Sequence, residues 1–94
     1  GEIAVFDARS GRILASYGGW RLLDRRSADW VAMARRRIGL TWQLATLSLD
    51  SGVAYPLGTF ESAGDEACRS TATHVACGVR SGDVLVWRLG PERD

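Results

Sequence analysis

The sequence predicts an all-β chain built from antiparallel hairpins. One hairpin signature returns three times, as an apolar strand, a small turn with Ser-Gly at its centre, and a second apolar strand. The three turns contain Ser10-Gly11, Ser51-Gly52 and Ser81-Gly82. A hairpin that recurs with glycine at its turn is typical of sheets laid down one after another, as in propellers and β-solenoids.

Taken in order, the apolar runs predict strands at residues 3–7, 12–17, 20–24, 30–34, 41–49, 53–60, 67–71, 73–79 and 84–89. Gly18-Gly19 ends the first hairpin. Pro56 demotes its strand to the edge of a sheet, because proline lacks the N–H that a central strand needs. Residues 61–66 form a polar linker, and residues 90–94 are a polar tail.

Residues 30–37 also admit a helix. Ser27, Ala28 and Asp29 would cap it, and Ala, Met and Arg are good helix formers. However, few turns fit before Gly39, and the segment that follows is clearly strand. We therefore favour a strand here and keep the helix as the alternative.

Several strands are apolar on both faces. Val5 and Phe6 are neighbours and must point in opposite directions, as must Leu85 and Val86. A two-layer sandwich would leave one face of each sheet polar, so we expect sheets covered on both sides. Radially packed propeller blades satisfy this pattern.

Grouping the strands by fours divides the chain into blades. Residues 1–19 supply the last two strands of one blade, residues 20–60 a complete blade, and residues 67–89 the first three strands of a closing blade. The predicted fold is therefore an incomplete β-propeller of about three consecutive antiparallel blades, with two, four and three strands. The chain starts at Gly1 directly on a strand, which predicts a piece of a longer protein.

The first turn carries a family resemblance. Residues 7–12, Asp-Ala-Arg-Ser-Gly-Arg, resemble the repeat Asp-x-x-Thr-Gly-Lys-x-x-Trp of pyrroloquinoline-quinone-type (PQQ-like) β-propellers. Residues 47–52 look like the same hairpin with a shorter turn. Residues 71–77 and 82–89 are similar to the closing blade of secreted bacterial members. The resemblance implies a quinoprotein-like repeat fold over nearly the whole chain.

The chain also departs from that family. The tryptophan that docks blade on blade would fall at Ala15 and at Pro56 in the first two repeats. The vicinal cysteines and the calcium site of true quinone enzymes are not visible. The resemblance therefore supports the fold without bringing the cofactor.

These observations predict a non-catalytic PQQ-like segment that serves as a scaffold or interaction module. Its partner would be another protein or upstream blades of the same chain. A C-terminal part of a quinone-dependent dehydrogenase is the alternative. A WD-type propeller is a further one, because residues 84–89 also resemble a WD closing strand, although the Gly-His and Trp-Asp landmarks are missing.

Cys68 and Cys77 flank a plausible turn at residues 71–73. In a hairpin they face each other across the strands, at a distance that suits a disulfide. Two buried free thiols are the alternative. Their spacing is not that of a zinc site, and His74 supplies too few further ligands. A disulfide would imply an extracytoplasmic location, either secreted or membrane-anchored through an upstream segment.

No residue set predicts an enzyme, a cofactor or a metal site. The sequence contains no nucleophile elbow that would make His74 part of a Ser-His-Asp triad. Glu61, Asp65 and Glu66 lie in the polar linker, where we expect solvated carboxylates rather than an acid–base pair. Gly18-Gly19 is a strand break and not a phosphate loop.

Composition adds little about partners. The formal net charge of +1 neither requires nor excludes a polyanion, and the use of arginine for all 12 basic residues fits a high-GC bacterial genome. Arg25-Arg26 and residues 35–37 lie near tryptophans, as in a nucleic-acid platform. We favour an exposed turn with protective edge charges, and tryptophans in the core, so no nucleic acid is expected. No apolar run is long enough to span a membrane.

Overall fold

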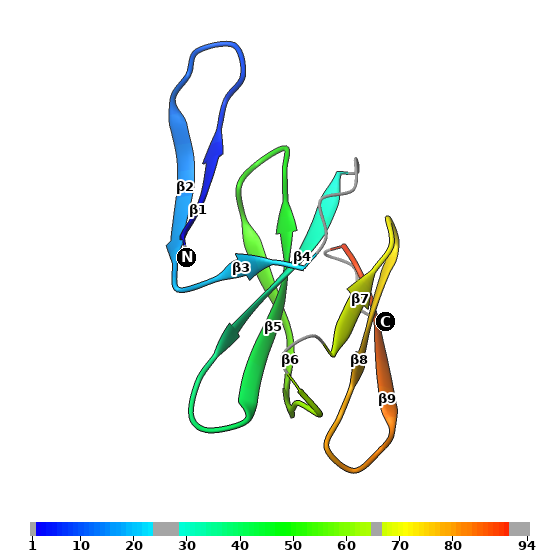
Figure 1. Cartoon of the computed structure of the whole chain (residues 1–94). Coiled ribbons are helices and arrows are strands. Elements are labelled where there is room, and N and C mark those ends of the chain that lie inside the picture. Colours follow the sequence, from blue (N-terminus) through cyan, green and yellow to red (C-terminus); the bar gives the residue numbers. More distant parts are fainter. Residues whose placement is uncertain (1, 24–28, 65–66, 91–94) are drawn as a thin grey trace.

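The computed structural model describes residues 2–23, 29–64 and 67–90. These residues form nine strands and no helix, with the bounds β1 Glu2–Phe6, β2 Ile13–Gly18, β3 Arg21–Leu22, β4 Trp30–Arg36, β5 Thr41–Ser48, β6 Ala54–Glu61, β7 Cys68–Ser70, β8 His74–Gly78 and β9 Val84–Arg88. They make three antiparallel sheets in chain order (Figure 1): β1–β2 is sheet 1, β3–β4–β5–β6 is sheet 2 and β7–β8–β9 is sheet 3. The all-β prediction is confirmed, and the helix alternative is excluded because β4 occupies its residues.

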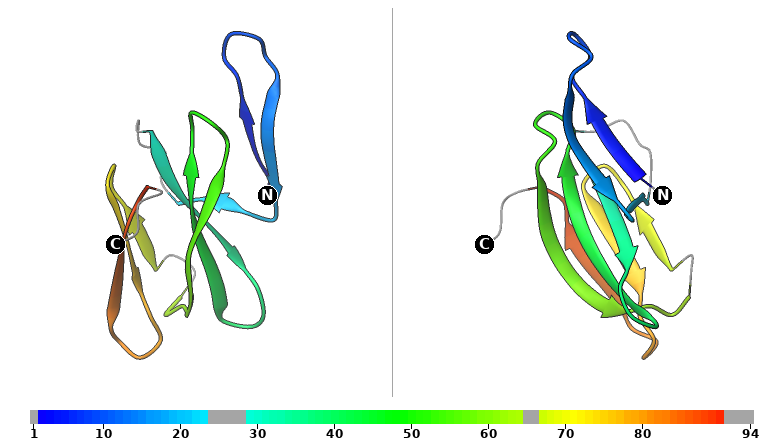
Figure 2. Two further views of the ribbon diagram at one scale, coloured as in Figure 1. Left: turned by 180° about the vertical axis from the view of Figure 1, so that it is seen from behind. Right: turned by 90° about the vertical axis from the view of Figure 1, so that its left-hand side faces the viewer.

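Sheet 2 lies between the other two sheets (Figures 1 and 2). Side chains alternate along β4 and β5, so each strand sends apolar groups to both faces. Toward sheet 1 the buried cluster comprises Ile3, Val5, Trp20, Val31, Met33, Ala45 and Leu47. Toward sheet 3 it comprises Ala32, Ala34, Trp42, Leu44, Phe60, Val75, Cys77 and Leu89. Both faces of the middle sheet are therefore hydrophobic core.

The stack is elongated. Its principal extents are 46 × 27 × 21 Å, and its radius of gyration is 13.3 Å. A compact chain of this length would have a radius of about 12 Å. The β1–β2 hairpin accounts for part of the excess, because it extends past the end of sheet 2 (Figure 1). The three sheets do not close a ring.

The first two Ser-Gly turns have the same hydrogen-bond pattern. The Gly11 N–H donates to the Asp7 carbonyl at 2.8 Å, and the Gly52 N–H donates to the Ser48 carbonyl at 2.8 Å. In both turns the serine hydroxyl before the glycine accepts a backbone N–H at 3.2 Å. The two glycines have φ of 75° and 78°, a region that favours glycine. The second turn is thus as long as the first, which corrects the expectation of a shorter one.

Pro56 lies on β6, at the edge of sheet 2, as predicted. Its position coincides with an irregularity in the ladder, where Ala45 pairs with Pro56 but Leu44 pairs with Gly58. The bulge leaves Leu57 without a direct partner across the strands. An edge position next to a bulge is where a sheet tolerates a residue that has no N–H donor.

The first two residues of the predicted linker take part in backbone pairing. Glu61 belongs to β6, and Ser62 forms an isolated antiparallel bridge with Val79. The Arg80 N–H donates to the Glu61 carbonyl at 2.9 Å, and the Ser62 N–H donates to the Leu40 carbonyl at 2.9 Å. Backbone pairing therefore continues from sheet 2 into sheet 3 through Glu61 and Ser62, which corrects the expectation that the linker begins at residue 61.

Candidate functional site

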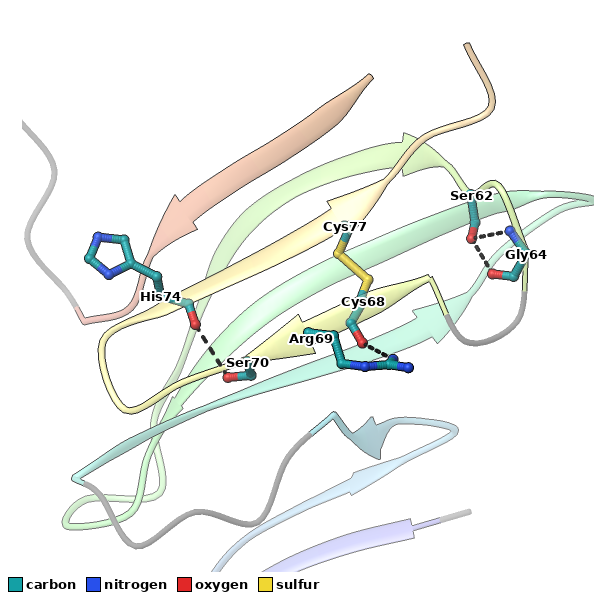
Figure 3. The surroundings of a disulfide bond; sticks show 7 residues. All are labelled: Ser62, Gly64, Cys68, Arg69, Ser70, His74 and Cys77. Carbon is teal, nitrogen blue, oxygen red and sulfur yellow. Dashed lines mark hydrogen bonds between the residues drawn. A yellow bond between two sulfur atoms is a disulfide. The ribbon is translucent and has the colours of Figure 1, made fainter. Parts of the chain in front are cut away.

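Cys68 and Cys77 lie directly opposite each other in the β7–β8 ladder. Their sulfur atoms are 2.04 Å apart, at disulfide distance, and their Cα atoms are 4.0 Å apart (Figure 3). Next to them, the Gly78 N–H donates to the Ala67 carbonyl at 2.9 Å, so the cysteines occupy a non-hydrogen-bonded position of the ladder. Facing side chains come closest at such positions. The register therefore accounts for the pairing expected from the sequence.

A groove opens between sheets 2 and 3, with a volume of about 180 Å³. We call it the inter-sheet groove; it is lined by Arg21, Leu22, Leu23, Ala34, Trp42, Phe60, Ser62, Gly64, Ala67, Cys68 and Arg69. Ala34, Trp42 and Phe60 are buried and form its apolar floor, while Arg21 and Arg69 are exposed at its rim. This groove could not be predicted from the sequence, because its lining residues come from segments that are far apart along the chain.

Two tryptophans of the core carry arginine side chains over their rings. Arg35 lies over Trp20, with its guanidinium carbon 4.9 Å from the ring centroid. Arg21 and Arg36 lie over Trp42, at 5.2 Å and 5.4 Å. Each such contact is worth about 0.5–1 kcal/mol near a surface. Because both indoles are buried, these rings are packing groups and offer no open stacking platform for bases.

Arg35 and Arg37 also make hydrogen bonds to a neighbouring side chain. The Arg35 Nε donates to the Gln43 Oε1 at 2.9 Å, and an Arg37 guanidinium N–H reaches the same oxygen at 3.4 Å. Arg25-Arg26, the other half of the basic cluster considered from the sequence, lies outside the described residues.

His74 is exposed at the start of β8, with its Nδ1 atom 2.8 Å from the Thr73 hydroxyl. Glu61 is exposed at the end of β6, and Asp65 and Glu66, the other two carboxylates of the predicted linker, lie outside the described residues. Within the described ranges, no three His, Cys, Asp or Glu side chains gather as a metal site requires. The same residues contain no helix that could span a membrane.

The outer faces of the two end sheets carry exposed apolar side chains. On sheet 1, Phe6 pairs with Ile13, and these residues are 56% and 60% exposed. On sheet 3, Val84 and Val86 are 64% and 61% exposed. Val86 stands beside Ala76 of β8, on the face turned away from sheet 2. We call these two surfaces the outer faces.

No family model matches the chain, and neither a curated protein nor a solved structure does. The sequence resemblance to PQQ-like repeats therefore remains an expectation that rests on the residues quoted for it.

Proposed function

We propose that the chain is a non-catalytic segment of a PQQ-like β-propeller and acts as a scaffold or interaction module. The observation that carries the proposal is the burial of sheet 2 on both faces by the sheets before and after it. Face-to-face packing of consecutive antiparallel sheets is the way propeller blades bury their apolar residues. The equal turns at Gly11 and Gly52 support a repeat, since neighbouring sheets reuse one turn design.

The contact between sheets 2 and 3 also supports a propeller-like stack. A Cβ atom added at Gly58 would lie 3.4 Å from the Trp87 Nε1 atom, so the indole rests on a position without a side chain. The Trp87 ring also lies 5.7 Å from that of Phe60, centroid to centroid. Trp87 therefore packs sheet 3 against sheet 2, although it does not stand at the position where the family repeat has its tryptophan.

The partner is a further sheet or protein that covers the outer faces. Isolated apolar residues on a surface need no explanation, but paired apolar residues on sheet faces resemble the surfaces that sheets 1 and 3 themselves use against sheet 2. An extracytoplasmic location belongs to the same proposal. It is supported by the cysteine pair at disulfide distance, because disulfides persist in oxidising compartments.

Sedimentation velocity of the purified chain tests this function. We expect association that grows with protein concentration, because the outer faces then cover one another. Val86→Asp should weaken it by about tenfold or more, since an unpaired charge is costly to bury. Ile38→Asp is the matched control: Ile38 is 82% exposed in the β4–β5 turn, away from both outer faces, and its replacement should have no effect. A chain that stays monomeric throughout, or an equal response to both substitutions, would contradict the proposal.

A further inference from the structure

The two cysteines of the Cys68–Cys77 link differ in their surroundings. Cys77 lies on β8, the middle strand of sheet 3, and is fully buried in the core toward sheet 2. Cys68 lies on the edge strand β7, is half-buried, and lines the inter-sheet groove. We propose that Cys68 is a site of thiol–disulfide exchange, which a low-molecular-weight thiol reaches through the inter-sheet groove, and that this exchange releases β7 from sheet 3.

The direction of attack favours Cys68. A thiolate approaches one sulfur of a disulfide from the side opposite the other sulfur, which then leaves. For Cys77 that side lies toward β9, where Leu85 stands directly opposite it in the ladder. For Cys68 that side lies outside sheet 3, because none of the described strands pairs with the outer edge of β7. The ladder therefore obstructs attack on Cys77 and leaves Cys68 open.

The inter-sheet groove supplies the approach to Cys68. Its lining also includes Ala67, the neighbour of Cys68, and Gly64. Its volume of about 180 Å³ is below the roughly 300–1,000 Å³ of pockets for drug-sized molecules. It therefore suits the thiol end of a small molecule such as glutathione.

The exchange is a two-electron reduction in two steps. The first thiolate forms a bond to the Cys68 sulfur, the Cys68–Cys77 bond breaks, and Cys77 leaves as a thiolate that takes a proton from water. A second thiolate attacks the small molecule's sulfur in this mixed disulfide. That step releases Cys68 and gives the disulfide of the small molecule, so two thiols are oxidised for each protein disulfide that is reduced.

Either step removes the covalent tether of β7. The three residues of β7 pair with β8 alone among the described strands. On its other side β8 pairs with β9, and the residues that β9 contributes do not depend on the link. We therefore expect exchange to open the β7 side of sheet 3 while the β8–β9 hairpin stays paired.

Peptide mapping tests the site of attack. The oxidised chain is exposed briefly to glutathione, the reaction is stopped with acid, and the adduct is located by mass spectrometry. We expect the adduct on Cys68 in about tenfold or greater excess over Cys77, since access decides which sulfur reacts. In concentrated guanidinium chloride the preference should disappear, because it comes from the fold. No adduct, equal amounts on both cysteines of the folded chain, or a preference that survives unfolding would overturn the proposal.

Gly64→Leu tests the route through the groove. Nothing lies within 4 Å of a Cβ atom added at Gly64, so the new side chain can occupy the groove without a clash. It should slow adduct formation at Cys68 by about tenfold, because exchange depends on access. Gly18→Leu is the matched control: Gly18 has the same free space and likewise no positive φ, but it ends β2 on sheet 1. Equal rates in the two variants would contradict this route.

Hydrogen exchange at two neighbouring amides tests the release of β7. The Gly78 N–H donates to the Ala67 carbonyl on the β7 side, and the Val79 N–H donates to the Asp83 carbonyl on the β9 side, both at 2.9 Å. Reduction by excess glutathione should speed exchange at Gly78 relative to Val79 by about tenfold or more, as local opening does. Equal acceleration at both amides, or none at Gly78, would overturn the release. None of these results bears on self-association, so the scaffold proposal is judged separately.

Discussion

Two glycines lie where one sheet meets the next. The carbonyl of Gly52 accepts a hydrogen bond from the Tyr17 hydroxyl at 2.5 Å, which ties the turn of sheet 2 to sheet 1. A Cβ atom at Gly52 would lie 3.2 Å from the Cβ atoms of both Leu14 and Ala15. Glycine at position 52 is therefore required by the contact between sheets 1 and 2 as well as by the turn.

Gly52→Ala should therefore destabilise the chain more than Gly11→Ala. Both glycines have nearly the same positive φ, so alanine costs about 1–2 kcal/mol of backbone strain in either turn. At Gly11 nothing lies within 4 Å of the added Cβ, whereas at Gly52 the new methyl group must push sheet 1 away. Overpacking of this kind costs roughly a further 1–3 kcal/mol. Denaturant unfolding of the two variants measures the difference, and equal losses would contradict the close contact.

Among the strands, β7 is the one whose place depends most on a covalent tether. It has three residues and lies at the edge of sheet 3. The Thr71 N–H donates to the His74 carbonyl at 2.8 Å and closes the turn, and Ser70 adds a hydroxyl near the same carbonyl (Figure 3). So short a strand buries little apolar surface of its own, so the Cys68–Cys77 link contributes a large share of its stability.

Mass spectrometry of the non-reduced chain should show a loss of about two mass units relative to the reduced form. Replacing both cysteines with alanine should lower the free energy of unfolding by ~2–3 kcal/mol, the loop-closure value for a loop of this length. Reduction of the wild-type chain should give a similar loss. Free thiols in both cysteines of the protein kept under oxidising conditions would rule out the bridge.

At the scale of the whole molecule, the sequence predicted the features that depend on the alternation of apolar side chains and on the residues of the turns. Strands that are apolar on both faces, such as residues 30–34, and the Ser-Gly turns indicated consecutive sheets. The spacing of Cys68 and Cys77 indicated the register of the hairpin that contains these two cysteines. The inter-sheet groove could not be predicted, because its lining residues come from separate sheets that the sequence alone does not bring together. The backbone pairing of Glu61 and Ser62 was not predicted either. The polar composition of this segment carries no information about backbone hydrogen bonds between sheets.

The absence of a quinone site is a prediction for the whole chain. No constellation in the sequence matches the cysteine and calcium ligands of quinone enzymes, and the inter-sheet groove is smaller than a pocket for such a cofactor. Titration with pyrroloquinoline quinone and calcium, followed by absorbance and calorimetry, should give no saturable signal. A stoichiometric complex of sub-micromolar affinity would favour the dehydrogenase alternative instead.

The central claim is that sheets 1, 2 and 3 stack in chain order, with sheet 2 in the middle. Nuclear Overhauser spectroscopy of the dilute oxidised chain tests it most directly, because it reports pairs of protons from different sheets. We predict cross-peaks between the Trp87 indole N–H and the Gly58 Hα protons, and between the Tyr17 ring and Gly52. Cross-peaks within each sheet but none between sheets would contradict the claim, and would leave three separate ribbons in place of a stack.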